Sequence, residues 1–322
     1  MKIKTEISYN LDLLCFLNIM TADDYYVKRH KEAFDKWYPK LSDTIKVKIS
    51  EMIAKQGYSM LAPTFTLFIS SLKDFNNRNL LEMLNNHCEI VSSMNNTQYI
   101  FELSRFEMYF SFFSETIVPL ITELEKNGFY EFWKEFQLPL IKAKCLQVDN
   151  YMQDYKVDDL ISQFRNFDSA DCTVYMCSFA NPHGIKLCGN KLISDVAYST
   201  DTILSNVTHE LFHPAFDFDI VKQSLQKLSE KSWVIDAFAN QNPNSGYHSM
   251  DGFIEEHIVE ALGIYVLVQL GIDIEPYEYF KTHDEGSHVL SPHFYKYLCE
   301  NKKGHSQSFE DYFMKFADSL IK

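Results

Sequence analysis

The sequence predicts an α+β protein that is mostly helical. Apolar residues recur at helical spacing through most of the first 165 residues. Three β-branched and aromatic segments follow between residues 172 and 197, and helical spacing returns after them. Because 46% of the 322 residues are hydrophobic, the chain can bury a large core. We expect a mainly helical N-terminal region over residues 1–168 and a second domain over residues 169–322, or one compact unit.

The N-terminal region is expected to hold one short strand and a series of helices. Pro119 should kink or divide the longest helix, because proline cannot donate a backbone hydrogen bond. The aromatic run from Phe101 to Phe113 predicts a packing face in preference to a substrate groove. The expected strand is Ile3–Ser8, and the expected helices are Leu11–Met20, Tyr25–Tyr38, Ile45–Lys55, Phe65–Leu72, Arg78–Asn85, Glu102–Asn127 and Phe129–Phe136.

Three segments after residue 171 are typical of β-strands. Cys172–Phe179 is rich in β-branched and aromatic residues, and a run of turn formers follows it. Ile185–Cys188 and Leu192–Ala197 are separated by Gly189-Asn190, which favours a hairpin. These segments predict a small antiparallel sheet.

The next predicted helix carries the most distinctive motif of the chain, HELFH at residues 209–213. Apolar residues at helical spacing predict a helix over Thr200–His213, with Ser199 or Thr200 as its N-cap. Pro214 should end or kink this helix, because it lacks a backbone N–H group. The motif therefore occupies the last turn of the helix.

The two histidines of this motif, His209 and His213, are one turn apart and can reach the same metal ion. Two imidazoles at this spacing, with a carboxylate directly after the first, are typical of a helix that holds Zn²⁺ and activates water. Glu210 supplies that carboxylate and is our candidate for the general base. The alternative is an ordinary buried helix that holds no metal.

A catalytic zinc site needs a third protein ligand and one open position. Asp217 and Asp219 lie just past Pro214 and are one possible source. The other source is a helix expected over Met250–Gly271, which is apolar on nearly every face in its second half and should be central. Acidic residues that enter such a helix need a partner, and a metal ion with two histidines would supply it.

Three glutamates of this second helix are candidates for the third ligand. Glu256 and Glu260 are four residues apart and share a face, so one can bind the metal while the other accepts a hydrogen bond from a ligand imidazole. We choose Glu256 as the ligand and Glu260 as the outer partner, with Glu255 and Glu260 as the alternative ligands. Glu255 lacks a partner at this spacing, so we expect it to face solvent.

With HELFH on one helix and an acidic ligand on a second, the chain resembles the gluzincin type of zinc metallopeptidase, most closely its bacterial members. The resemblance covers residues 172–270, or about a third of the chain. It implies a zincin-like catalytic domain over residues 169–322 that hydrolyses peptide bonds of a peptide or protein substrate with Zn²⁺. It also implies that one strand of the small sheet holds the substrate; the alternative is a hairpin that only supports the helix.

Hydrolysis also needs a donor that stabilises the oxyanion of the transition state. Tyr247 and His248 lie in a turn-rich loop just before the Glu256 helix, and His288 and His293 lie after that helix. These four residues are our candidates for the donor. For each of them, surface or core packing is the alternative.

Composition limits the partners of the chain. A formal net charge of −14 argues against nucleic-acid binding and against docking on anionic membranes. We find neither a secretory signal nor a transmembrane segment in the sequence pattern. The seven scattered cysteines predict buried, reduced thiols and a cytoplasmic location. The rival to a peptidase is a zinc-binding but inactive helical interaction protein.

Overall fold

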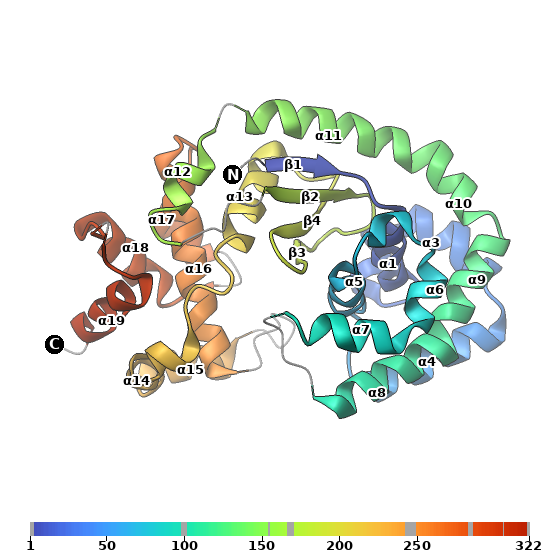
Figure 1. Cartoon of the computed structure of the whole chain (residues 1–322), viewed down its shortest axis with the longest axis horizontal. Helices are drawn as coiled ribbons and strands as arrows, with labels where there is room; N and C mark the ends of the chain where they lie inside the picture. Colours follow the sequence, from blue (N-terminus) through green and yellow to red (C-terminus); the bar gives the residue numbers. More distant parts are fainter. Residues whose placement is uncertain are drawn as a thin grey trace. The chain divides into compact units, whose positions relative to one another are not determined.

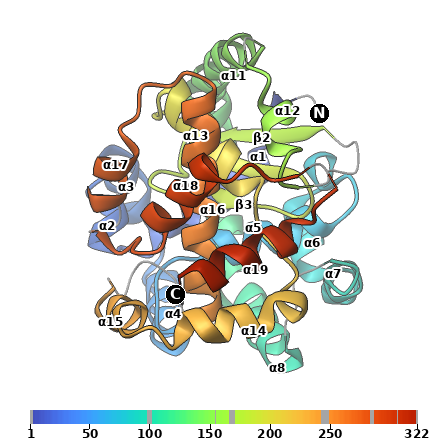
Figure 2. The same ribbon diagram turned by 90° about the vertical axis from the view of Figure 1, so that its left-hand side faces the viewer.

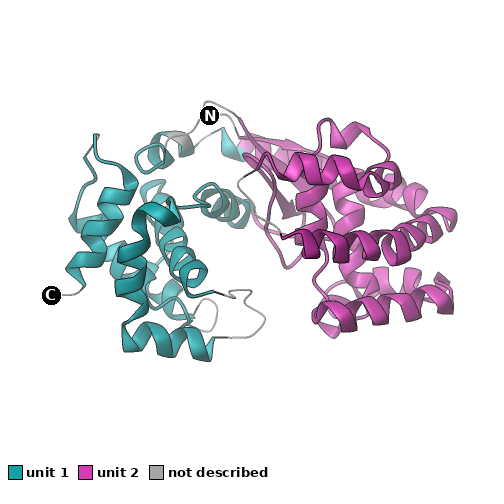
Figure 3. Ribbon diagram, turned by 60° about the horizontal axis from the view of Figure 1, so that its bottom comes forward, with its two compact units in different colours: residues 1–2, 151–170, 200–322 teal, residues 3–150, 171–199 magenta. Residues whose placement is uncertain are grey.

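A computed structural model describes residues 3–97, 102–153, 155–165, 171–241, 249–282, 286–304 and 306–320. Over these ranges the chain is mostly helical, with one small mixed sheet of four strands, which is consistent with the α+β class. The chain divides into two compact units (Figure 3): unit 2 comprises residues 3–150 and 171–199, and unit 1 comprises residues 1–2, 151–170 and 200–322. The boundary expected at residue 168 lies outside the described residues.

The sheet belongs to unit 2 and has the strand order β1-β2-β4-β3. β1 pairs in parallel with β2, and β2 pairs in parallel with β4, so that Tyr175 lies opposite Ile193. Only β3 and β4 form the expected antiparallel hairpin, so the prediction of an antiparallel sheet is wrong for the other pairs. The local hairpin signal cannot reveal a pairing with a strand from the start of the chain. The strands are β1 (Ile3–Glu6), β2 (Cys172–Cys177), β3 (Ile185–Lys186) and β4 (Lys191–Asp195).

Helices make up the rest of unit 2 (Figure 1). The expected helix over residues 25–38 is divided in two, and two helices, α7 and α11, were not predicted. Ser8 begins α1 by accepting the backbone N–H of Leu11 with its hydroxyl group. The helices are α1 (Tyr9–Met20), α2 (Asp24–Val27), α3 (Lys31–Trp37), α4 (Asp43–Gln56), α5 (Ala62–Ser71), α6 (Leu80–Asn85), α7 (His87–Met94), α8 (Leu103–Phe112), α9 (Val118–Lys126), α10 (Phe129–Phe132) and α11 (Leu138–Met152).

The helix expected over Glu102–Asn127 is divided near Pro119, which lies in the first turn of its second part, α9. A π-helical turn joins α8 to α9 directly before the proline, and in it the N–H of Val118 donates to the carbonyl of Phe113. A second π turn joins α10 to α11 before Pro139, where the N–H of Leu138 donates to the carbonyl of Trp133. In both places the wider turn lets the helix continue past a residue that has no N–H group.

Unit 1 is built around α16. Helices α12, α13, α14 and α18 all pack against it, and α18 covers the face that is turned toward the viewer in Figure 2. Ser249 accepts the N–H of Gly252 at the start of α16, and Gly271 follows its end with a positive φ of 83°. The helix expected over Met250–Gly271 is thus present over Met250–Gln269. The helices are α12 (Val157–Ile161), α13 (Thr200–Glu210), α14 (Phe218–Ser229), α15 (Ser232–Asn240), α16 (Met250–Gln269), α17 (Pro276–Thr282), α18 (Ser291–Glu300) and α19 (Phe309–Ser319).

The cysteines and the apolar helices match the sequence only in part. All seven cysteines are unpaired thiols, and five of them are buried. Cys88 and Cys299 are exposed, so the prediction of buried thiols is wrong for these two. Among the helices of the described ranges, none combines the length and the apolar character that crossing a membrane requires.

Candidate metal centre

The two histidines of the HELFH motif lie at the end of α13. The regular helix stops at Glu210, three residues earlier than expected. The chain then continues as a tighter turn with hydrogen bonds between residues three apart. The N–H of Phe212 donates to the carbonyl of His209 at 2.9 Å, and the N–H of His213 donates to the carbonyl of Glu210 at 3.4 Å. His209 is therefore part of the helix, whereas His213 lies beyond its last regular turn.

α13 packs directly against α16, and both helices belong to unit 1 (Figure 1). Gly263 of α16 lies at the closest approach: a Cβ atom at this position would be 3.7 Å from both the Cα and the backbone N of His209. Gly263 follows Glu256 by seven residues and therefore shares its face of the helix. The absence of a larger side chain lets the backbone of His209 lie close to α16 and its glutamates.

Two imidazoles and one carboxylate meet at this crossing. The Nε2 atoms of His209 and His213 are 3.1 Å apart. The carboxylate of Glu256 faces both rings, with Oε1 at 3.1 Å from Nε2 of His209 and Oε2 at 3.4 Å from Nε2 of His213. Among the described residues, this is the one group of three or more His, Cys, Asp or Glu side chains that could hold a metal ion. The structure thus brings together the three ligands that the sequence predicts.

The spacing of these atoms fits a zinc ion. Donor atoms bound to a tetrahedral zinc at about 2.0–2.2 Å lie about 3.3–3.5 Å apart. The two Nε2 atoms are 3.1 Å apart, and they lie 3.1 and 3.4 Å from the two different carboxylate oxygens of Glu256, so each separation is close to that value. The side chains of His209, His213 and Glu256 also keep 20%, 21% and 14% of their surface exposed, which leaves a path for a metal ion and a water molecule. The donor set could therefore hold a metal ion.

The other nitrogen of each imidazole is held by a buried glutamate. Nδ1 of His209 donates to Glu260 at 2.8 Å, and Nδ1 of His213 donates to Glu255 at 2.9 Å. These bonds fix the ring orientation and leave both Nε2 atoms to face the metal position. Glu260 takes the outer role expected of it. The expectation that Glu255 faces solvent is wrong: this residue is only 8% exposed.

The prediction that Glu255 faces solvent fails where α13 ends early. The Oε1 atom of Glu255 accepts the backbone N–H of Ala215 at 2.9 Å in addition to the ring Nδ1–H of His213. Beyond the helix end the ring turns toward the neighbouring face of α16, where Glu255 lies.

The charges of the centre shift the pKa of each ligand. Burial lowers the pKa of His209, but Glu256 and Glu260 outweigh burial and hold that pKa well above its ordinary value. Burial also lowers the pKa of His213, while Glu255 and Glu256 together raise it to about 10. Burial raises the pKa of Glu256, yet the two imidazoles hold it well below its ordinary value. Without a metal the centre favours protonated imidazoles. A metal ion must displace a proton from each imidazole that it binds.

The remaining candidates lie in several places. Glu210 is the last residue of α13 and is half-buried. Asp217, an alternative ligand, instead begins α14, where its carboxylate accepts the N–H of Asp219 at 2.9 Å. Tyr247 and His248 lie outside the described residues.

The two other histidine candidates lie against further aromatic side chains of unit 1. His288 is 1% exposed, and its ring centroid is 5.2 Å from that of His257. His293 is exposed, and its ring centroid is 5.3 Å from that of Trp233. Partial desolvation lowers the pKa of His293. Both remain predictions as oxyanion donors.

Comparisons of the chain with protein-family models, with curated proteins and with solved structures found no match.

Proposed function

We propose that the chain is a zinc-dependent peptidase. One observation carries the proposal: two imidazole Nε2 atoms and the Glu256 carboxylate converge at ligand spacing, while Glu255 and Glu260 hold both Nδ1 atoms. Paired outer carboxylates of this kind are the usual support of imidazole ligands in zinc sites. An ordinary helix crossing does not require five ionisable side chains to be arranged in this way.

The residues of the centre have separate roles. His209, His213 and Glu256 hold the ion, which when bound supplies a Lewis acid and lowers the pKa of water toward neutrality. Glu210 accepts a proton from the attacking water and returns it to the leaving amine. One of Tyr247, His248, His288 and His293 donates a hydrogen bond to the developing oxyanion.

The proposed substrate is a peptide or protein, and the proposed location is the cytoplasm. With a net charge of −14, the chain favours neutral or basic peptides over nucleic acids or anionic membranes. The alternative function, a zinc-binding helical interaction protein without hydrolytic activity, shares the metal centre but assigns no proton transfer to Glu210.

The test is Glu210→Gln in tag-free, full-length protein. Zinc content is measured by elemental analysis, and hydrolysis is measured with a mixed library of quenched fluorescent peptides. The variant should keep its zinc and lose about 10²–10⁴-fold in hydrolysis rate, because it cannot accept a proton. The control is Glu278→Gln on the exposed surface of α17, which should leave both readings unchanged.

The other outcomes distinguish the remaining interpretations. If Glu210→Gln hydrolyses peptides at the rate of the native chain, Glu210 is not the base. If the native chain holds zinc but cleaves none of the peptides, the non-hydrolytic alternative is favoured. If the native chain holds no metal, the helix crossing is structural and the proposal fails.

A further inference from the structure

The backbone around His213 cannot be held by its own helix. Pro214 has no N–H group to continue the ladder, and the last carbonyls of a helix carry partial negative charge without a partner inside the helix. The carbonyls of Leu211 and His213 lie just beyond the last turn of α13, and the second belongs to the metal ligand itself. Some other part of the molecule has to satisfy them.

Arg165 satisfies both carbonyls. It follows α12, and its Nη1 atom donates to the carbonyl of Leu211 at 2.5 Å and to that of His213 at 2.7 Å. A guanidinium at a helix C-terminus is favoured both by its charge and by its hydrogen bonds. Because one nitrogen joins two carbonyls, it fixes the distance between them and therefore the turn on which His213 lies.

We infer that Arg165 is a positioning residue for the metal ligand His213. Arg165 holds the backbone of His213 through its carbonyl, and Glu255 holds the ring through Nδ1 and the following chain through Ala215. The Arg165 guanidinium thus holds the backbone of His213, and the Glu255 carboxylate holds its ring. The inference rests on the proposed metal function of His213.

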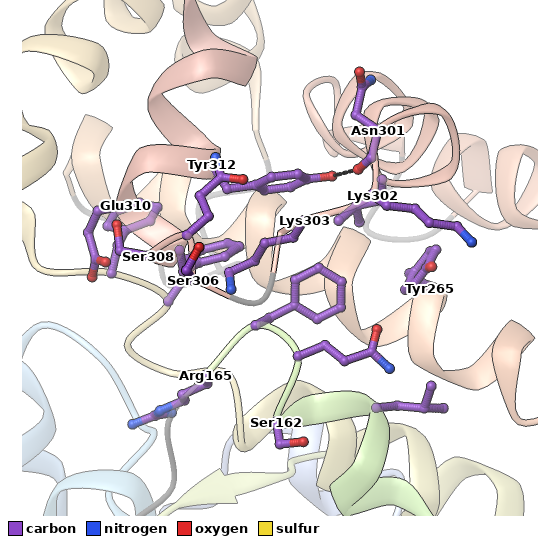
Figure 4. Close-up of a pocket in the computed structure, with 18 of the residues that line it drawn as sticks. Ser162, Arg165, Tyr265, Asn301, Lys302, Lys303, Ser306, Ser308, Glu310 and Tyr312 are labelled. Atoms are coloured by element: carbon purple, nitrogen blue, oxygen red, sulfur yellow. Dashed lines mark hydrogen bonds between the residues drawn. The ribbon is translucent and has the colours of Figure 1, made fainter.

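The surroundings of Arg165 make the inference testable by chemical rescue. Arg165 lines a cavity of about 1250 Å³ within unit 1, together with Ser162, Pro214, Ala215 and Lys303 (Figure 4). In this view Arg165 lies at one edge of the cavity, and Lys303 comes from the opposite wall. A small cation can therefore reach the space that a shortened residue 165 would leave.

The experiment compares Arg165→Ala with the native protein. The zinc dissociation constant is measured by competition with a chromophoric chelator, and the visible spectrum of the Co²⁺-substituted protein reports ligand geometry. Arg165→Ala should weaken zinc binding about 10–100-fold, the range typical of lost outer support for a ligand. Millimolar guanidinium should recover part of this loss, whereas the same concentration of tetramethylammonium should not. Arg165→Lys should be intermediate, because an ammonium lacks the planar guanidinium geometry.

Lys303→Ala is the matched control, since it removes a cation from the same cavity without touching the HELFH turn. It should leave zinc affinity and the cobalt spectrum unchanged. If Arg165→Ala binds zinc as tightly as the native chain with the same cobalt spectrum, the positioning role is wrong. A loss of affinity that guanidinium does not recover and that Lys303→Ala reproduces would also overturn it. Failure of the native chain to bind zinc would instead overturn the proposed function.

Discussion

The two histidines of the metal centre are held in different ways. His209 lies inside α13, where the helix and the close approach of Gly263 fix its backbone. His213 lies beyond the end of the helix, where Arg165, Glu255 and Pro214 surround it. One ligand is therefore placed by regular structure and the other by side chains from distant parts of the sequence. We expect the second ligand to be the more sensitive to substitution of its neighbours.

The largest expected effect is the response of both histidines to pH. Each carries a raised pKa in the metal-free centre, and that of His213 is about 10. Zinc must displace these protons, so its affinity should rise about tenfold per pH unit for each displaced proton, or at least about 100-fold from pH 6.5 to pH 8.5. Zinc titration against a chelator across this range measures the slope.

The metal-free protein should show the opposite dependence. A histidine whose pKa is raised on folding contributes stability that is complete below its unfolded pKa of about 6.5. The contribution of His213 is then lost as the pH rises toward about 10. The gap in Tm between zinc-loaded and metal-free protein should therefore widen from pH 6 to pH 9. A gap that stays constant, or that narrows, would contradict the proton displacement.

The next largest effect separates the two outer glutamates. Loss of outer support typically weakens metal binding about 10–100-fold. Glu260→Ala should lie at the lower end of this range, because Glu260 holds the ring of a residue that the helix already places. Glu255→Ala should lie at the upper end, because it releases both the ring of His213 and the buried N–H of Ala215.

Chelator competition with each variant measures this difference. Glu255→Gln serves as the matched control, since its amide oxygen keeps an acceptor for one of the two N–H groups. It should bind zinc more tightly than Glu255→Ala. Equal losses for Glu255→Ala and Glu260→Ala would show that the two histidines are equally well held, contrary to the comparison drawn above.

The same difference explains which site residues the sequence could predict. Their spacing of four residues predicts that His209 and His213 lie close together, and the same spacing predicts that Glu256 and Glu260 share a face of α16. The contact of Glu255 with the His213 ring was not predictable, because His213 lies beyond the early end of α13. The role of Arg165 was not predictable from the sequence. Every residue has a backbone carbonyl, so a hydrogen bond to that group does not depend on the type of the accepting residue.

The parts of the fold that depend on neighbouring residues were also predictable, and the long-range pairings were not. The β3–β4 hairpin and the start and stop of α16 depend on neighbouring residues, and both agree with the sequence. The parallel pairing of β1 with β2 joins Ile3 to Cys172, and no local pattern specifies which distant strand is the partner. Pro119 divides the expected helix as predicted, but helical spacing alone does not reveal the π turn that joins the two parts.

The smallest expected effect concerns Gly263, which is part of the support of His209. An added methyl group would meet the backbone of His209 at 3.7 Å, an ordinary contact distance. Alanine also favours a helix interior over glycine by about 1 kcal/mol. Gly263→Ala should therefore raise the free energy of unfolding by up to about 1 kcal/mol, as measured by chemical denaturation of the metal-free protein.

Zinc affinity should not change in this variant, because the methyl group fills space without moving α13. Gly252→Ala is the matched control on the same helix: its Cβ atom would lie 3.0 Å from the hydroxyl oxygen that begins α16, so it should gain less stability or lose some. A marked loss of zinc affinity in Gly263→Ala would show that His209 depends on the closest possible approach of the two helices. Its position would then be as easily disturbed as that of His213, and regular structure would offer the first ligand no advantage.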